Sequence, residues 1–188
     1  MNEPVPSAAD GHRSKRGPFT VQFFEVLILA ATLLATVIIS ALTLHQTTRH
    51  FEIERTSAFV ARFNGPDMVS LREQVNRWLK SGETPAALYA RENSADPKAA
   101  SEASETIARL MTIANFFEEF GSAIEVGSLD EHYAHVLLGG LCIQFGRSLE
   151  PFIKEARIQR QRPQLFEEVF FLRDRMLELE NREKAGAG

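Results

Sequence analysis

The sequence predicts an all-α protein in which one transmembrane helix near the N-terminus is followed by an antiparallel helical bundle. Two observations lead to this fold class. An apolar run from Val26 to Leu44 contains no charged residue, glycine or proline. After that run, apolar residues recur at the three-and-four spacing of amphipathic helices, and no stretch combines strand-like alternation with hairpin turn residues.

Composition and breakpoints divide the chain into five parts. The first part holds three prolines and two glycines without periodicity, a composition that does not bury enough apolar surface to fold. The expected parts are a tail over residues 1–18, a transmembrane helix over 19–44, a helical extension or linker over 45–63, a helical domain over 64–182 and a second tail over 183–188.

The apolar run matches the length of a membrane-spanning helix. It has 19 residues from Val26 to Leu44, and a helix needs about 20 residues to cross the hydrocarbon core of a bilayer. A cleaved signal peptide and a buried core helix are the alternatives. Signal peptides usually carry apolar regions of only about 7 to 15 residues, and a soluble helix normally keeps one polar face. A membrane span is therefore the favoured interpretation.

Basic residues around the run give the span a weak orientation. Arg13, Lys15 and Arg16 precede it, while Arg49 and Arg55 follow it. Because cytoplasmic flanks are enriched in Lys and Arg, this distribution leans slightly towards a cytoplasmic N-terminus.

The first helices after the span are delimited by proline and glycine. The run from His45 to Phe63 lacks both residues, so the helix is expected to continue to Phe63, where Asn64, Gly65 and Pro66 stop it. A helix is predicted from residue 66 to 81 before Gly82, and a short one follows from about 84 to 91. Residues 93–103 contain no large apolar side chain and are predicted to form a loop.

Three longer helices are expected in the second half of the chain. The first covers about residues 101–126 and ends before Gly127. The next is capped by Asp130 and should break or kink near Gly146 and Pro151. The last begins at Pro163 and carries an apolar stripe that must pack on something. We expect this stripe to be the interaction surface, made of Leu165, Val169, Leu172, Met176 and Leu179.

Charge and cysteine content exclude some functional classes. The formal charge of −4 gives no support for a nucleic-acid-binding face. The lone cysteine, Cys142, cannot form an internal disulfide, so the fold depends on packing. No serine lies in a nucleophile elbow, and no cofactor is expected.

One short segment brings together residue types that can bind a metal ion. Asp130, His132 and His135 lie within six residues. Histidine ligands on one helix are usually four residues apart, or a glutamate pairs with a histidine three residues on within a multi-helix set. The pattern here fits neither arrangement, so a solvated helix face is the favoured interpretation of this segment.

Charged residues elsewhere suggest internal pairing. Glu118 follows two phenylalanines, and its carboxylate is expected to form a structural ion pair with an arginine such as Arg157. The basic residues Lys154, Arg157, Arg160 and Arg162 are interrupted by glutamates, which favours an internal network over a site for anionic lipid.

Several short motifs carry a resemblance to a known family. They are Arg62-Phe63-Asn64-Gly65-Pro66, Asn115-Phe116-Phe117-Glu118-Glu119-Phe120-Gly121, Gly127-Ser128-Leu129-Asp130 and Arg162-Pro163-Gln164-Leu165-Phe166. Together with the span, from about Val26 to Leu177, they resemble an uncharacterised, mainly bacterial family of small single-span membrane-anchored helical proteins, a domain of unknown function. The resemblance implies a bacterial inner membrane location and no particular activity.

These observations lead to one expected function and two alternatives. The expected function is a membrane-anchored helical interaction or scaffold module without catalytic activity. Its partners are the lipid bilayer, through residues 19–44, and a protein or a second copy of the chain, with no nucleic acid. The first alternative is a metal-binding or hydrolytic enzyme that uses the segment from Asp130 to His135. The weaker alternative is an anionic-lipid-binding domain.

Overall fold

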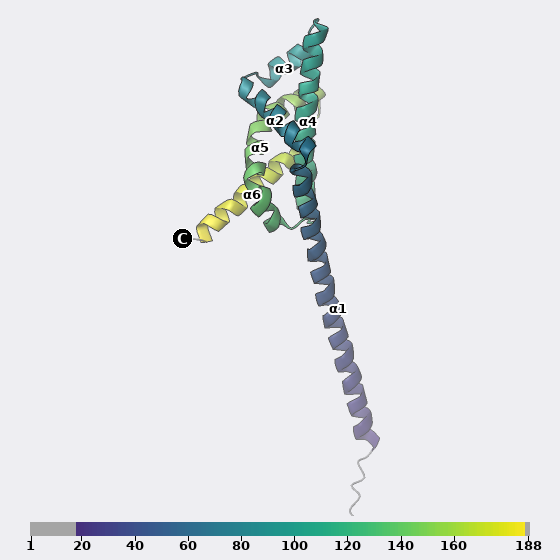
Figure 1. Ribbon diagram of the computed structural model, residues 1–188. Coiled ribbons are helices and arrows are strands. Elements are labelled where there is room, and N and C mark those ends of the chain that lie inside the picture. The colour runs from purple at the N-terminus through teal and green to yellow at the C-terminus, as the bar shows by residue number, and fades with distance from the viewer. Residues whose placement is uncertain (1–17, 187–188) are drawn as a thin grey trace, which may run out of the picture. The chain divides into compact units, whose positions relative to one another are not determined.

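The structure is a computed structural model that describes residues 18–186, and these residues form six α-helices (Figure 1). No strand occurs within this range, as the sequence predicts. Contacts divide the chain into two units, residues 1–47 and 48–188. The predicted tail over residues 1–18 lies almost wholly outside the described part of the chain.

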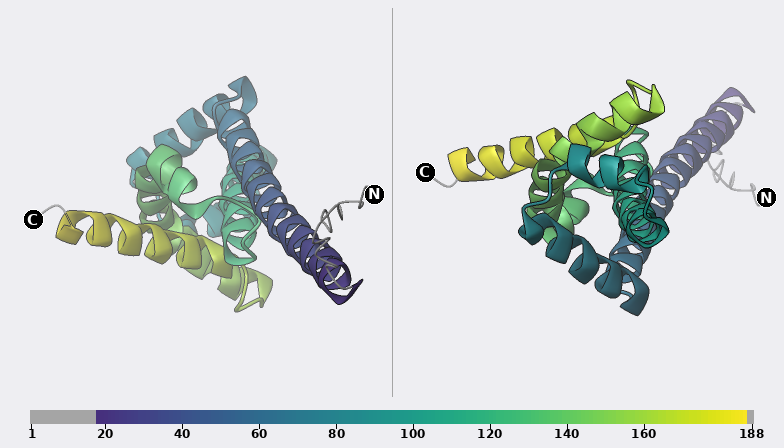
Figure 2. Two further views of the ribbon diagram at one scale, coloured as in Figure 1. Left: turned by 90° about the horizontal axis from the view of Figure 1, so that it is seen from below. Right: turned by 90° about the horizontal axis from the view of Figure 1, so that it is seen from above.

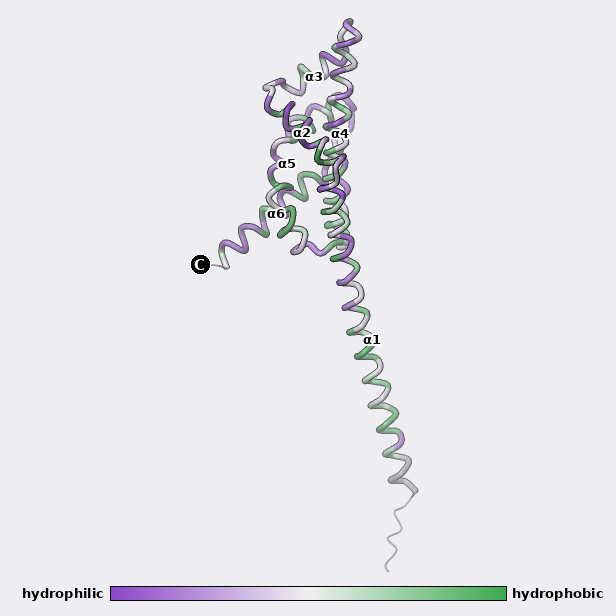
Figure 3. The backbone as a smooth tube through the Cα atoms, viewed as in Figure 1, coloured by the Kyte–Doolittle hydropathy of each residue, from purple (hydrophilic) through white to green (hydrophobic). Residues whose placement is uncertain are grey.

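The first unit contains the apolar part of helix α1 (Pro18–Phe63), the green run along this helix in Figure 3. Its described side chains from Phe23 onwards are exposed. Thr32 and Thr36 donate their hydroxyls to the carbonyl oxygens of Ile28 and Thr32, each at 2.8 Å, so these polar atoms are satisfied within the helix. Among the described helices, α1 alone has the length and apolar composition of a membrane-crossing helix, and none of its most apolar window is buried. Such a helix is either a membrane span or a signal sequence.

The second unit begins with the last part of α1, which ends at Phe63 as predicted. Helix α2 (Pro66–Ser81) starts with its proline in the first turn and ends at Gly82, whose φ of 76° is left-handed. Helix α3 (Pro85–Glu92) is capped by the Thr84 hydroxyl, which accepts a hydrogen bond from the Ala87 N–H. The predicted boundaries of both helices are confirmed to within a residue or two.

Helix α4 (Pro97–Glu125) begins earlier than the sequence analysis expected. The predicted loop over residues 93–103 is wrong from Pro97 onwards. Asp96 accepts a hydrogen bond from the Lys98 N–H and caps the helix, while Pro97 occupies its first turn. The alanines that follow have high helix propensity. Only Ala103 among them is buried, so this part of the helix is stabilised by its cap and its propensity and does not depend on large apolar side chains.

Helix α5 (Glu131–Arg160) runs without a break through Pro151, so the predicted break is wrong, while the alternative of a kink stays a prediction. A proline inside a helix removes one backbone hydrogen bond. The neighbouring residues Leu149, Phe152 and Ile153 are fully buried, and their packing holds this part of the chain helical. Gly146 lies under Arg173, where a β-carbon would come within 2.8 Å of the arginine Cβ.

Helix α6 (Glu167–Gly186) starts four residues later than predicted and includes residues 183–186 of the segment expected to be a tail, while residues 187–188 lie outside the described part of the chain. Residues 163–166 form turns, because Phe166 has a positive φ of 60° that places its ring in the core but cannot belong to a helix. Ion pairs between Glu178 and Arg182 and between Glu180 and Lys184 support the last turns.

The core of the second unit is rich in phenylalanine. Phe63 lies 5.4 Å from Phe116 and 5.9 Å from Phe117, measured between ring centroids, and Phe117 lies 5.2 Å from Phe145. Helix α6 packs mainly on α5 and α4, and α4 also packs on α2 and α3 (Figure 2). The second unit therefore has its own hydrophobic core, to which all its helices contribute.

Candidate functional site

The apolar stripe predicted as the interaction surface is part of this core. Val169, Leu172 and Met176 are buried, at 1% exposure or less. Leu165 and Leu179 are partly buried against the same cluster. The stripe packs on helices of its own chain, so an interaction surface has to be sought elsewhere on the domain.

The segment suggested for metal chemistry has structural roles instead. The Asp130 carboxylate accepts a hydrogen bond from the Tyr133 N–H at 2.8 Å and caps α5. The Nδ1 atoms of His132 and His135 lie 3.9 Å and 3.3 Å from the same Glu183 carboxylate oxygen on α6. Within the described residues, no group of three histidine, cysteine, aspartate or glutamate side chains is arranged to hold a metal ion.

The predicted ion pair between Glu118 and Arg157 is not formed as direct contact among the described residues. Glu118 instead accepts a hydrogen bond from the Val169 N–H at 3.2 Å and so caps the start of α6. The Arg157 Nε donates to the Leu165 carbonyl oxygen at 2.8 Å, and its guanidinium lies over the Phe170 ring. Both residues stabilise the turn before α6, and Arg157 acts on Glu118 only through its charge.

This turn also borders a cavity. The cavity has a volume of about 530 Å³ and combines amide, carboxyl and guanidinium groups with apolar side chains. Partial burial raises the pKa of the Glu118 carboxyl, and the hydrogen bonds from Val169 and Glu168 partly offset this effect. The cavity is lined by Asn115, Glu118, Gln161, Arg162, Pro163, Gln164, Leu165 and Phe166.

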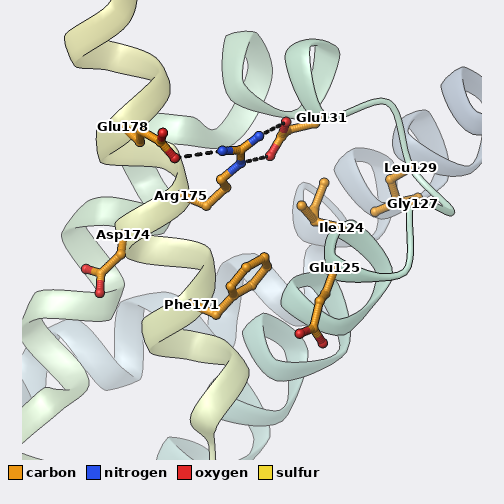
Figure 4. A pocket seen from close by; sticks show the side chains of 9 residues that line it. All are labelled: Ile124, Glu125, Gly127, Leu129, Glu131, Phe171, Asp174, Arg175 and Glu178. Carbon is orange, nitrogen blue, oxygen red and sulfur yellow. Dashed lines mark hydrogen bonds and ion pairs between the residues drawn. The ribbon is translucent and has the colours of Figure 1, made fainter.

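The larger opening on the domain is a groove where the end of α4, the start of α5 and the middle of α6 meet (Figure 4). Its volume is about 670 Å³, within the range of roughly 300 to 1,000 Å³ that is usual for binding sites. We call it the acidic groove, because four of its nine lining residues are acidic. The nine lining residues are Ile124, Glu125, Gly127, Leu129, Glu131, Phe171, Asp174, Arg175 and Glu178.

One wall of the acidic groove is held by an arginine on α6. Arg175 reaches across to α5, where its Nε and Nη2 atoms both donate to the Glu131 carboxylate, the latter at 2.8 Å (Figure 4). Its Nη1 atom donates to Glu178 at 2.6 Å. The hydrogen bond from Arg175 lowers the pKa of Glu178. Because the pairing with Glu131 is bidentate and joins two helices, it gives this wall a defined geometry.

The other carboxylates of the groove are less engaged. Glu125 makes no ion pair among the described residues, and Asp174 pairs only with Arg173, its neighbour in sequence. Figure 4 shows both carboxylates away from the Arg175 cluster. The Phe171 ring lies between α6 and the end of α4, with Ile124 and Leu129 on the far side. The groove thus combines an apolar floor with an acidic rim.

Sequence reasoning did not find the acidic groove. Its residues come from three stretches centred near 127, 131 and 175, and each stretch looks like an ordinary solvated helix end. The acidic residues that line it are far apart in the sequence, and their spacing carries no information about which helices meet.

Comparison with known proteins gives one match. The model of the family described as "Domain of unknown function (DUF4760)" matches residues 30–176. The match begins within the apolar part of α1 and ends in α6. No curated protein and no solved structure is significantly similar to the chain.

Proposed function

The chain belongs to the DUF4760 family, and we propose that it is a membrane-anchored helical interaction module in which α1 spans the bilayer and the second unit binds a partner. The observation that carries this proposal is the apolar part of α1, which is long enough to cross a membrane and has no buried residue in its most apolar window. An apolar helix of this length exposed to water would be unstable, so it needs lipid around it.

Two further observations favour a retained span over a cleaved signal peptide. The uninterrupted run from Val26 to Leu44 exceeds the usual apolar length of a signal peptide, which is about 7 to 15 residues. The family match also includes residues 30–47, which cleavage after the run would remove. A folded domain that keeps this helix is held at a membrane surface.

The second unit supports a binding role rather than a chemical one. In the acidic groove the guanidinium of Arg175 is already paired with two carboxylates. The histidines of α5 face Glu183 and the Asp130 carboxylate caps a helix. These side chains hold helices together, which leaves surface shape and charge as the means of recognising a partner.

Membrane extraction of a chain tagged at both ends tests the anchor. We expect both tags on one product that stays with the membrane at alkaline pH and is released by detergent. Replacing Leu34 and Val37 by arginine should move the protein to the soluble or aggregated fraction, since each charge at the centre of a span costs about 2.5 to 3.5 kcal/mol. The matched control is replacement of the same residues by alanine. Loss of the N-terminal tag from a soluble product would refute the proposal.

A further inference from the structure

We infer that the acidic groove binds a basic segment of a partner protein, one in which lysine or arginine side chains flank large apolar ones. This inference rests on the proposed function, because it names the kind of partner that the anchored domain recognises. It depends on the shape of the groove, on its charge and on the state of its carboxylates.

The charge of the groove selects a cation. Four carboxylates line it against the single guanidinium of Arg175. That guanidinium donates to Glu131 and to Glu178 through three of its five N–H groups, and these two carboxylates more than offset its charge, so the groove does not favour an anion. Complementary charge at an interface steers association and excludes partners of the wrong sign.

The rim of the groove has a carboxylate that can pair with a basic side chain of the partner. Glu125 has no cationic partner among the described residues, although Glu168 lies close enough for its carboxyl to feel the Glu125 charge. Burial raises the pKa of Glu168, and Glu125 and Glu167 raise it further. A lysine or arginine placed beside Glu125 would relieve this repulsion between like charges.

The floor of the groove requires apolar side chains as well. Ile124, Leu129 and Phe171 form it. Ile124 and Leu129 are buried, so the accessible apolar surface comes from the partly buried Phe171 and from Val126 next to it, which is 74% exposed. A free polyamine or a metal ion would leave this surface in water. A protein segment in which basic residues flank large apolar ones covers the floor and the rim at once, because lysine and arginine lay their aliphatic stems on apolar surface and keep their charges at the edge.

The wall of the groove is prepared before binding. The bidentate contact between Arg175 and Glu131 fixes the distance between α5 and α6 at this point. A groove that already has its bound geometry loses little conformational entropy when a partner enters.

Peptide binding to the full-length protein in a non-ionic detergent tests the inference. The probe is a labelled helical peptide of lysine and leucine, with fluorescence anisotropy as the readout. We expect saturable binding that weakens as salt is added. A peptide in which glutamate replaces each lysine should not bind, and micelles without protein give the background.

Charge reversal in the groove is the decisive comparison. Glu125→Lys with Asp174→Lys should weaken binding by about tenfold or more, since it replaces attraction at the rim by repulsion. The matched control is Glu73→Lys with Glu102→Lys, which changes the net charge equally at exposed positions outside the groove. It should retain most of the affinity. Trp78 fluorescence verifies that both variants are folded.

Three outcomes of the peptide experiment would overturn the inference. They are absence of peptide binding, equal binding by the groove variant, and equal loss in both variants, which would indicate attraction to net charge alone. Self-association of the chain that only the groove variant abolishes would assign the groove to a second copy and also overturn it. Because binding in detergent does not depend on anchoring, failure of the groove and failure of the membrane span are distinguishable.

Discussion

Two glycines of the second unit lie in opposite surroundings and should respond oppositely to substitution. A β-carbon at Gly121 in α4 would collide with the carbonyl oxygen of Glu168, where the start of α6 crosses. A β-carbon at Gly140 in α5 would meet nothing within 4 Å. Gly121→Ala should lower the free energy of unfolding by about 1 to 3 kcal/mol because it overpacks backbone against backbone. Gly140→Ala should raise it by about 0.5 to 1 kcal/mol.

Urea unfolding of the full chain in detergent, followed by fluorescence, measures both effects. Trp78 is the only tryptophan. It lies in the second unit, with its indole N–H bonded to Glu83, so it reports on the helical domain alone. A Gly121→Ala variant as stable as the parent would contradict the close packing of α4 against α6.

Glu118 should make the stability of the domain depend on pH. Partial burial raises its pKa above the ordinary value of 4.5, so the folded chain binds this proton more tightly than the unfolded chain does. Its contribution is therefore present at low pH and is lost as the pH rises from 4.5 through the folded pKa. Glu118→Gln keeps an oxygen to accept the Val169 N–H and removes the charge, so its stability relative to the parent should increase over this pH range.

Parallel urea titrations at several pH values check this expectation. Glu119→Gln is the control for net charge, because Glu119 is exposed and pairs with the exposed Arg62. The predicted role of Glu118 would be wrong if the free energy of unfolding of Glu118→Gln differed from that of the parent by the same amount at every pH.

At the scale of the helix, most of the ends that the sequence predicted correctly are marked by proline, glycine or a capping aspartate. Helices α2 and α3 begin at Pro66 and Pro85, and α2 ends at Gly82. The start of α4 carries the same kind of signal in Asp96 and Pro97, but its first turns lack large apolar residues, so apolar periodicity predicts a later start. The start of α6 was missed for another reason. It depends on the positive φ of Phe166, which tertiary packing of the ring imposes.

The position of Pro151 gives a prediction for α5. The proline lies inside an unbroken helix and is exposed, while Leu149 and Phe152 beside it are buried. Pro151→Ala restores a backbone hydrogen bond and should stabilise the domain by about 1 to 3 kcal/mol, since proline inside a helix costs about 3 kcal/mol relative to alanine. A higher midpoint of urea unfolding is the expected result. Destabilisation would show that the packing of Phe152 requires the geometry that proline imposes.

Candidate sites were harder to predict than helices, because a site depends on which helices meet. The spacing from Leu165 to Leu179 correctly indicates one apolar face of α6, but spacing alone does not distinguish a face for a partner from a face for the core. Glu131 and Arg175 show the converse. They are 44 residues apart, and only the packing of α5 on α6 brings them together.

At the scale of the whole molecule, the two units differ in the polarity of their surfaces, although the family match includes parts of both. The first is uniformly apolar over the residues described with side chains as far as Leu44, apart from Glu25 and a few hydroxyls. The second has its own phenylalanine-rich core and carries the acidic groove. Because the family match covers parts of both, an account of function has to include the apolar helix as well as the domain.

For the proposed membrane-anchored form, the basic residues that flank the apolar run predict the side of the membrane on which the second unit lies. Arg13, Lys15 and Arg16 precede it, against Arg49 and Arg55 after it. Since cytoplasmic flanks retain lysine and arginine, we expect the C-terminal domain on the non-cytoplasmic side. An alkaline phosphatase fusion at the C-terminus should therefore be active, and a green fluorescent protein fusion should be dark.

Because the two flanks differ by only one basic residue, replacing a few charges should change the orientation. Replacing Arg13, Lys15 and Arg16 by glutamine leaves only Arg49 and Arg55, so phosphatase activity should fall and fluorescence should rise as the chain inverts. Replacing Arg49 and Arg55 by glutamine instead should strengthen the original orientation, and it controls for loss of charge as such. A fluorescent, phosphatase-negative fusion of the parent chain would reverse the assignment and place the acidic groove in the cytoplasm, where its basic partner would then have to be sought.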